Sequence, residues 1–154
     1  MADFNAAVAK TIINEGGSKF TNDPDDKGGP TRYGIAQNYH PGINAETLTE
    51  DQAKEIYRRE YWTPIHGDEI TSQGVAEMLF DSAVNLGVGA TVKVSRAVLG
   101  AEDWLPAVNA KSPSEFIAEF ILAKIARYVR ICEKTPTSKK YFYGWVRRAL
   151  QGVA

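Results

Sequence analysis

One carboxylate in the sequence, Glu15, stands at a position where helix electrostatics favour a cation. Apolar residues that recur every four positions predict a helix over residues 3–15, with Asp3 as its N-cap and Gly16-Gly17 at its end. Partial burial and the negative end of the helix dipole both favour the protonated form of a carboxyl group, as a general acid requires. The alternative interpretation is an ordinary glutamate at a frayed helix end that points into water.

Three aspartates follow the glycine pair closely, at Asp23, Asp25 and Asp26. An acid and an opposing carboxylate that flank one bond form the arrangement used in glycoside hydrolysis. One of the three aspartates is therefore a candidate for the second carboxylate. The alternative for each is a turn-forming role, because Asp side chains bond to nearby backbone amides and tolerate unusual backbone angles. We expect at least two of them to form turns.

Other kinds of catalytic site find little support in the sequence. The two histidines, His40 and His66, and the single Cys132 make neither a zinc set nor a clear Cys-His couple, and Cys132 is expected in the core. A faint calcium-loop pattern begins at Asp23 but has Lys27 and Gly34 at its fifth and twelfth positions, where oxygen ligands are needed. Glycine motifs for phosphate or dinucleotide binding do not occur. We therefore predict no cofactor and no metal.

The charge of the chain is divided unevenly along its length. Residues 1–110 hold 9 basic and 16 acidic side chains, whereas residues 111–154 hold 9 basic and 3 acidic ones, although the net charge of the 154 residues is only −1. The basic part suits an anionic polymer such as cell wall, phospholipid or nucleic acid, and the simpler alternative is a solvated helix surface. The near-neutral total excludes a general nucleic-acid binder.

Neither a membrane span nor a secretion signal is evident in the sequence. No apolar stretch approaches the ~20 residues that cross a bilayer, so we expect no stable membrane insertion. The first nine residues lack a basic segment followed by an apolar one. The protein is therefore expected to be made in the cytoplasm without a signal peptide, and a substrate outside the inner membrane requires another component for release.

The elements that must position these residues are mostly helices. Caps, glycines and apolar periodicity predict a single mainly α domain over residues 1–154, of the α+β kind, with a small β-hairpin near the N-terminus formed by residues 19–21 and 31–36. About six helices are expected, at residues 3–15, 49–62, 72–86, 90–99, 112–133 and 138–151.

Several blocks of the sequence resemble glycoside hydrolase family 108, whose members are phage and prophage N-acetylmuramidases with a lysozyme-like fold. The resemblance covers nearly the whole chain, and its first block is long and specific. The blocks are Glu15-Gly16-Gly17, Asn22-Asp23-Pro24 with Asp26, Gly28-Gly29, Thr31, Tyr33-Gly34-Ile35, residues 57–62, residues 80–87 and residues 144–148. The resemblance implies that residues 1–110 form an acidic catalytic part and residues 111–154 a basic helical part of one muramidase domain.

The resemblance also implies roles for three residues. Glu15 takes the place of the catalytic acid, Asp26 that of the second acidic residue, and Thr31 that of the threonine that holds the attacking water in phage lysozymes. Two departures from the family pattern leave either Asp25 or Asp26 as the second acid. Asp25 occupies a position where a neutral residue is common, and four residues separate Gly17 from Asn22 where the family often has two. The resemblance favours inversion over retention of the anomeric configuration, which the sequence does not decide.

Further residues are candidates for substrate binding. Flat rings suit pyranose faces, and the candidates of this kind are Tyr33, Tyr57, Tyr61 and Trp62, although core packing is the simpler role for each. Asp81 and Asn85, four apart on an apolar helix, share one face and either line a cleft or tie this helix to the loop of Asp26. Trp145, with its tyrosine neighbours, is expected in the core with a wet edge or, alternatively, in a wall-contact patch.

The function that follows is hydrolysis of the β-1,4 bond between N-acetylmuramic acid and N-acetylglucosamine by a phage or prophage endolysin acting in the periplasm and cell wall. The expected partner is a peptidoglycan glycan strand, with a holin for export, no nucleic acid, and a monomer as the default state. Three alternatives stay open: a lytic transglycosylase, a chitinase on the same scaffold, and a non-catalytic module that binds the wall or assists secretion.

Overall fold

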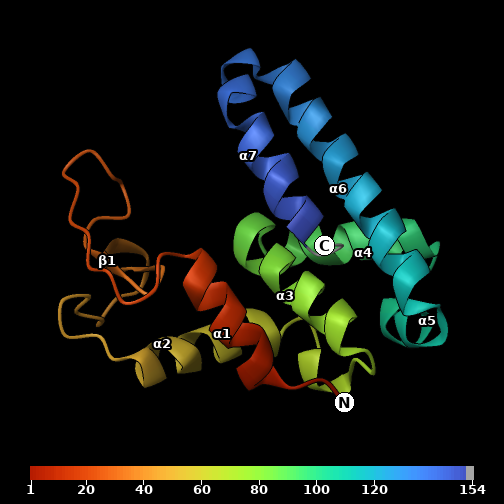
Figure 1. Cartoon of the computed structure of the whole chain (residues 1–154), viewed down its shortest axis with the longest axis horizontal. Coiled ribbons are helices and arrows are strands. Elements are labelled where there is room, and N and C mark those ends of the chain that lie inside the picture. The colour runs from red at the N-terminus through yellow and green to blue at the C-terminus, as the bar shows by residue number, and fades with distance from the viewer. Residues whose placement is uncertain (152–154) are drawn as a thin grey trace. The chain divides into compact units, whose positions relative to one another are not determined.

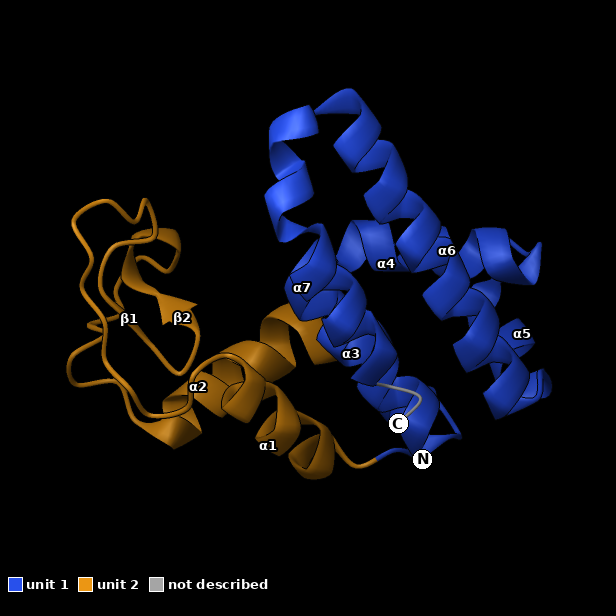
Figure 2. Ribbon diagram, turned by 45° about the horizontal axis from the view of Figure 1, so that its top comes forward, with its two compact units in different colours: residues 1–2, 65–154 blue, residues 3–64 orange. Residues whose placement is uncertain are grey.

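A computed structural model describes residues 1–151, and this part of the chain is mainly helical, as predicted. It contains seven α-helices and one two-stranded antiparallel sheet (Figure 1). The chain divides into two compact units, residues 3–64 and residues 1–2 with 65–154 (Figure 2). Each unit is described by itself below.

The first helix of the 3–64 unit begins and ends where the sequence predicts. Helix α1 spans Phe4–Asn14, and the Asp3 side chain caps it by accepting a hydrogen bond from the Asn5 amide at 2.8 Å. Its apolar stripe, which includes Val8 and Ile12, is buried. Two glycines with positive φ, +99° and +62°, then turn the chain directly after Glu15.

The second helix of this unit, α2, spans Glu50–Tyr57 and starts with the predicted capping box between Thr49 and Gln52. A π-helical turn, Arg58–Trp62, extends it. Such turns occur often at functional sites because they re-aim the side chains that follow an ordinary helix. Here the turn carries Tyr61 and Trp62, two of the aromatic candidates.

The small sheet differs in detail from the prediction. Strands β1, Thr31–Arg32, and β2, Ile35–Ala36, form a hairpin entirely within the segment expected to be one strand, and Thr21 contributes only a single bridge to Thr31. Tyr33 and Gly34 make the turn, both with positive φ, 53° and 75°. A two-residue turn of this kind matches the natural twist of paired strands. The prediction missed it because tyrosine rarely adopts a left-handed backbone.

The other unit is a set of five helices. They are α3 (Gln73–Leu86), α4 (Val88–Leu99), α5 (Trp104–Ala110), α6 (Pro113–Lys134) and α7 (Lys139–Leu150). Four of them were predicted, and α5 was missed because seven residues show too little periodicity. Helices α6 and α7 run side by side (Figures 1 and 2). Cys132 of α6 is buried in the core, as expected. Among the described residues, no helix is both long and apolar enough to cross a membrane.

Candidate active site

Glu15 occupies the C-cap of α1, with a backbone geometry that is fixed on both sides. Its amide donates to the Thr11 carbonyl at 2.9 Å, and the Gly17 amide, beyond it, returns to Ile12 at 2.8 Å. The residue is half-buried. The predicted position at the end of the opening helix is therefore correct, and Glu15 is neither fully buried nor fully exposed there.

The turn of the β-hairpin lies directly against Glu15. A Cβ atom added at Gly34 would come within 2.6 Å of the Glu15 Cβ and 2.5 Å of the Tyr57 hydroxyl, so only glycine fits here. The Tyr57 hydroxyl donates to the Tyr33 carbonyl at 3.0 Å, and the Tyr33 amide donates to Gly17 at 3.2 Å. Helix α1, the hairpin and helix α2 thus meet around the carboxylate.

Tyr61 is another aromatic candidate close to this meeting point. Its ring lies 5.9 Å from the ring of Tyr57, between centroids, and the residue is half-buried. Burial raises the pKa of Tyr61, and the negative charges of Glu60 and Glu15 raise it further. The hydroxyl therefore stays protonated near neutral pH and is available as a hydrogen-bond donor close to Glu15.

The other aromatic candidates of this unit belong to its core. Trp62 has 0% and Tyr57 1% of its surface exposed, and Phe4 packs edge-on against Trp62 at 5.5 Å between ring centroids. A ring without exposed surface offers no face to a sugar, so core packing, the simpler role expected for each, accounts for both rings in this structure. Tyr33 is 9% exposed and acts mainly through its backbone at the hairpin turn.

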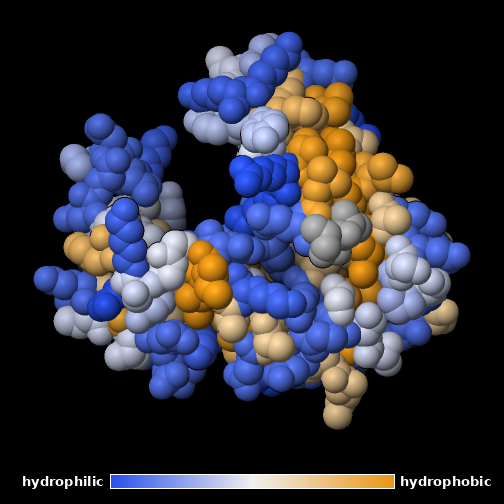
Figure 3. All heavy atoms as spheres, viewed as in Figure 1, coloured by the Kyte–Doolittle hydropathy of each residue, from blue (hydrophilic) through white to orange (hydrophobic). Residues whose placement is uncertain are grey.

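The aspartate loop, residues 22–30, is exposed over residues 22–27 and belongs to the hydrophilic surface at the left of Figure 3. Its carboxylates shape the turns of the loop itself. Asp26 Oδ1 accepts from the Gly28 amide at 2.8 Å, and Asp23 Oδ1 accepts from the Asp25 amide at 2.9 Å. These are the turn-forming roles expected for two of the three aspartates. A carboxylate has two oxygens, so holding the turn through Oδ1 does not occupy Asp26 Oδ2.

Thr31 lies at the start of β1, where the aspartate loop enters the hairpin. Its hydroxyl donates to the Gly29 carbonyl at 2.9 Å, and the residue is half-buried. Because the hydroxyl proton is used in this bond, the oxygen presents acceptor lone pairs to other donors. That geometry suits a group that orients a water molecule.

A second feature of this unit, not foreseen from the sequence, is a clamp on the segment after the hairpin. His40 Nδ1 lies 2.8 Å from the Ala36 carbonyl and Nε2 lies 3.0 Å from Glu60 Oε2. Both partners are hydrogen-bond acceptors, and the imidazole ring lies between them. The clamp fastens the end of β2 to the π-helical turn that carries Tyr61.

Asp81 and Asn85 belong to α3, in the other unit. Asp81 forms an ion pair with Arg148 of α7, at 2.9 Å and 3.4 Å between the paired atoms, so it ties α3 to another helix of its own unit. Asn85 lies one turn further along α3 and is half-buried. Sequence spacing gave no signal for this pair, because its members lie 67 positions apart.

Beside this ion pair lies a buried polar contact between α3 and α6. Lys124, 2% exposed, donates from Nζ to Ser82 Oγ at 3.0 Å. Burial lowers the pKa of Lys124, Asp81 opposes this shift, and Arg148 adds to it. A buried lysine is kept where hydrogen bonds and a nearby carboxylate compensate for its desolvation.

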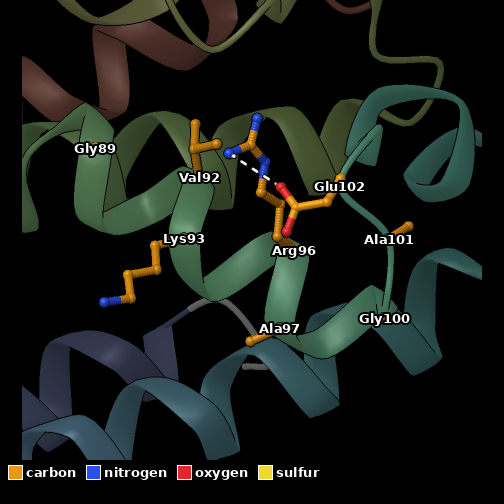
Figure 4. Close-up of a pocket in the computed structure, with 8 residues that line it drawn as sticks. All are labelled: Gly89, Val92, Lys93, Arg96, Ala97, Gly100, Ala101 and Glu102. Carbon is orange, nitrogen blue, oxygen red and sulfur yellow. Dashed lines mark ion pairs between the residues drawn. The ribbon is translucent and has the colours of Figure 1, made fainter.

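A cavity of about 720 Å³ runs along α4, and none of the predicted site residues lines it. Arg96 and Glu102 pair across one side of it at 3.5 Å, and Lys93 points the other way (Figure 4). Among the described residues, no group of three or more His, Cys, Asp or Glu side chains is arranged to hold a metal ion.

Comparison with known proteins assigns the two parts of the sequence differently. Residues 8–87, just over half of the chain, match the family model described as glycosyl hydrolase 108, and residues 90–150 match a model described as a predicted peptidoglycan domain. The fold is similar to a structure of SagA from Brucella abortus, with a TM-score of 0.77 and 26% identity over 97% of this chain and 90% of that one. No curated protein matches the sequence. Glu15, Asp26 and Thr31 all fall within the first match, whereas α7 falls within the second.

Proposed function

Because the chain belongs to the glycosyl hydrolase 108 family, we propose that it hydrolyses the β-1,4 bond between N-acetylmuramic acid and N-acetylglucosamine in peptidoglycan. The observation that supports this most directly is the seat of Glu15, a half-buried carboxylate held between the end of α1 and the hairpin turn. The match of residues 90–150 to a predicted peptidoglycan domain supports the same substrate.

In the proposed mechanism, Glu15 donates a proton to the glycosidic oxygen as the bond from that oxygen to the anomeric carbon breaks. The Tyr61 hydroxyl, whose pKa is raised by burial and by the charges of Glu60 and Glu15, is available in this mechanism as a hydrogen-bond donor near Glu15. A water molecule adds to the anomeric carbon and passes its proton to Asp26, while the Thr31 oxygen accepts a hydrogen bond from that water. The products are two shorter glycans, one with a new reducing end.

The decisive test replaces the acid without changing its shape. Glu15→Gln is expected to lower turnover on purified peptidoglycan by about 10²–10⁴-fold, as for loss of a general acid, with an unchanged thermal midpoint. Glu55→Gln, an exposed carboxylate on α2, is the matched control and keeps full activity. A Glu15→Gln protein with wild-type turnover refutes the proposal.

The products separate this proposal from its rivals. Mass spectrometry of the digest is expected to show reducing N-acetylmuramic ends; anhydro-muramic ends identify a lytic transglycosylase instead. Cleavage of chitin but not of peptidoglycan identifies a chitinase. Wall binding without turnover by the wild-type protein identifies a non-catalytic module.

The biological setting is a further part of the proposal. We propose an endolysin that acts on the periplasmic wall after release, with a holin or similar protein opening the inner membrane. Expression inside a Gram-negative host checks this: lysis is expected only when a holin is co-expressed, and lysis by the protein alone contradicts dependence on a second component.

A further inference from the structure

One face of α7 carries an aromatic and polar row that the proposed chemistry does not use. Tyr141, Trp145 and Arg148 follow one another at spacings of four and three, so they lie on the same side of the helix. The row belongs entirely to the unit of residues 1–2 and 65–154, and to the segment that matches a predicted peptidoglycan domain.

The aromatic part of the row is a three-ring stack. Trp145 lies 5.3 Å from Tyr128 of α6 and 5.9 Å from Tyr141, between ring centroids, with the Tyr141 ring inclined to it by only 29°. Tyr128 is 2% exposed and Tyr141 is 53% exposed. The stack therefore runs from the core to the surface, and its buried end holds the outer ring in place.

The polar part of the row continues from the stack onto α3. Arg148 is fixed by its two contacts with Asp81, whose side chain is 22% exposed, and Asn85 follows one turn along α3. At the other end, Lys140 Nζ lies 4.9 Å from the centre of the Tyr141 ring. The surface thus offers a flat ring beside positioned donors and acceptors.

We propose that this row of α7, Tyr141, Trp145 and Arg148, together with Asp81 of α3, is a glycan-binding surface that holds the N-acetylhexosamine rings of a peptidoglycan strand. This inference rests on the proposed function, and it specifies the glycan strand as the part of the wall that residues 90–150 bind. The apolar face of a pyranose ring packs on the exposed part of the Tyr141 ring and displaces the Lys140 ammonium that lies over it. Its hydroxyl and acetamide groups find fixed partners in the Arg148–Asp81 pair, and Lys140 matches the negative charge of the wall.

Binding is tested with the full chain in a Glu15→Gln background, so that the polymer is not cut. The ligands are purified sacculi and glycan strands from which an amidase has removed the peptides. Tyr141→Ala is expected to weaken binding to both by about 2–13-fold, the range for one aromatic contact, and Tyr141→Phe to restore it. Tyr143→Ala is the control, because this tyrosine is 77% exposed and lies two positions on, toward another side of the helix.

Each outcome bears on the assignment. The assignment is overturned if Tyr141→Ala and Tyr143→Ala weaken binding equally, or if neither variant weakens it. Weakening for intact sacculi alone also overturns it, because the peptide is then the ligand. Circular dichroism checks that each variant is folded. Turnover is measured separately in proteins that keep Glu15, so that loss of the proposed hydrolysis is distinguished from loss of glycan binding at this surface.

Discussion

Gly34 occupies a position in the hairpin turn that has no room for a side chain. In Gly34→Ala the new Cβ would lie 2.5 Å from the Tyr57 hydroxyl and 2.6 Å from the Glu15 Cβ, against 3.4–4 Å for ordinary contact. The hairpin turn, Tyr57 or the Glu15 side chain, the proposed general acid, must therefore move by about 1 Å. Both the stability of this unit and the placement of Glu15 are affected.

The size of the effect follows from three contributions. An alanine at φ +75° is strained by about 1–2 kcal/mol. Overpacking adds about 1–3 kcal/mol, and a weakened hydrogen bond from Tyr57 to Tyr33 adds about 1 kcal/mol. We expect the free energy of unfolding to fall by about 3–6 kcal/mol. Because a displacement of about 1 Å at a reacting group costs about 10²-fold in rate, turnover is expected to fall by that factor.

Gly100→Ala separates the clash from the backbone strain. Gly100 has φ +63°, and a Cβ added there meets nothing within 4 Å. This variant is expected to lose only the strain contribution, about 1–2 kcal/mol of stability, and no turnover. Urea unfolding gives the free energies, and release of reducing ends from purified peptidoglycan gives the rates. If Gly34→Ala matches Gly100→Ala in both measurements, the inferred contact between the hairpin turn and Glu15 is wrong.

Two further predictions concern buried polar groups. Burial raises the pKa of Tyr128 to about 12; since the unfolded tyrosine loses its proton near pH 10, stability is expected to fall by up to about 2 kcal/mol as pH rises from 10 to 12. Tyr128→Phe removes that fall in urea unfolding at about pH 9 and about pH 11, and an equal fall in the variant contradicts the assignment. Glu60→Ala leaves His40 without its carboxylate partner and is expected to lower stability by about 1–2 kcal/mol. Glu69→Ala, which removes an exposed His–Glu pair, changes stability by less than about 0.5 kcal/mol; equal effects of the two variants in urea unfolding refute the proposed clamp.

Local chemistry made most of the helices predictable. Asp3 caps α1 and the glycine pair ends it, and Thr49 with Gln52 forms the expected box, because each signal acts over only a few residues. The position of Glu15 followed from those same signals. The mainly α class with a small β element was likewise visible in the sequence.

What the sequence did not reveal depends on contacts between distant segments. The pairing of Asp81 with Arg148 joins two helices with more than sixty residues between them, and no periodicity encodes it. Trp62 lies in an aromatic cluster that looks alike in sequence whether it lines a cleft or fills a core; only packing against Phe4 decides. The hairpin register depends on a left-handed tyrosine, Tyr33, which intrinsic preference disfavours.

The choice between Asp25 and Asp26 as second acid, open in the sequence, becomes a testable difference in geometry. Asp26 Oδ1 holds the Gly28 amide, which fixes the direction of its side chain, whereas the Asp25 backbone is itself held by Asp23. A fixed carboxylate is better placed to act repeatedly on one water molecule. Asp26 is therefore the residue that we expect to be essential.

Asp26→Asn keeps an oxygen acceptor for the Gly28 amide but removes the charge, so turnover on purified peptidoglycan is expected to fall by about 10²-fold or more with little change in stability. Asp26→Ala loses the turn bond as well and is expected to cost about 1 kcal/mol in addition. Asp25→Asn is expected to keep wild-type turnover, because in this proposal the Asp25 side chain neither holds the Gly28 amide nor accepts a proton from the water. The reverse result, an inactive Asp25→Asn beside an active Asp26→Asn, assigns the second acid to Asp25 and shows that the bond to Gly28 only shapes the loop.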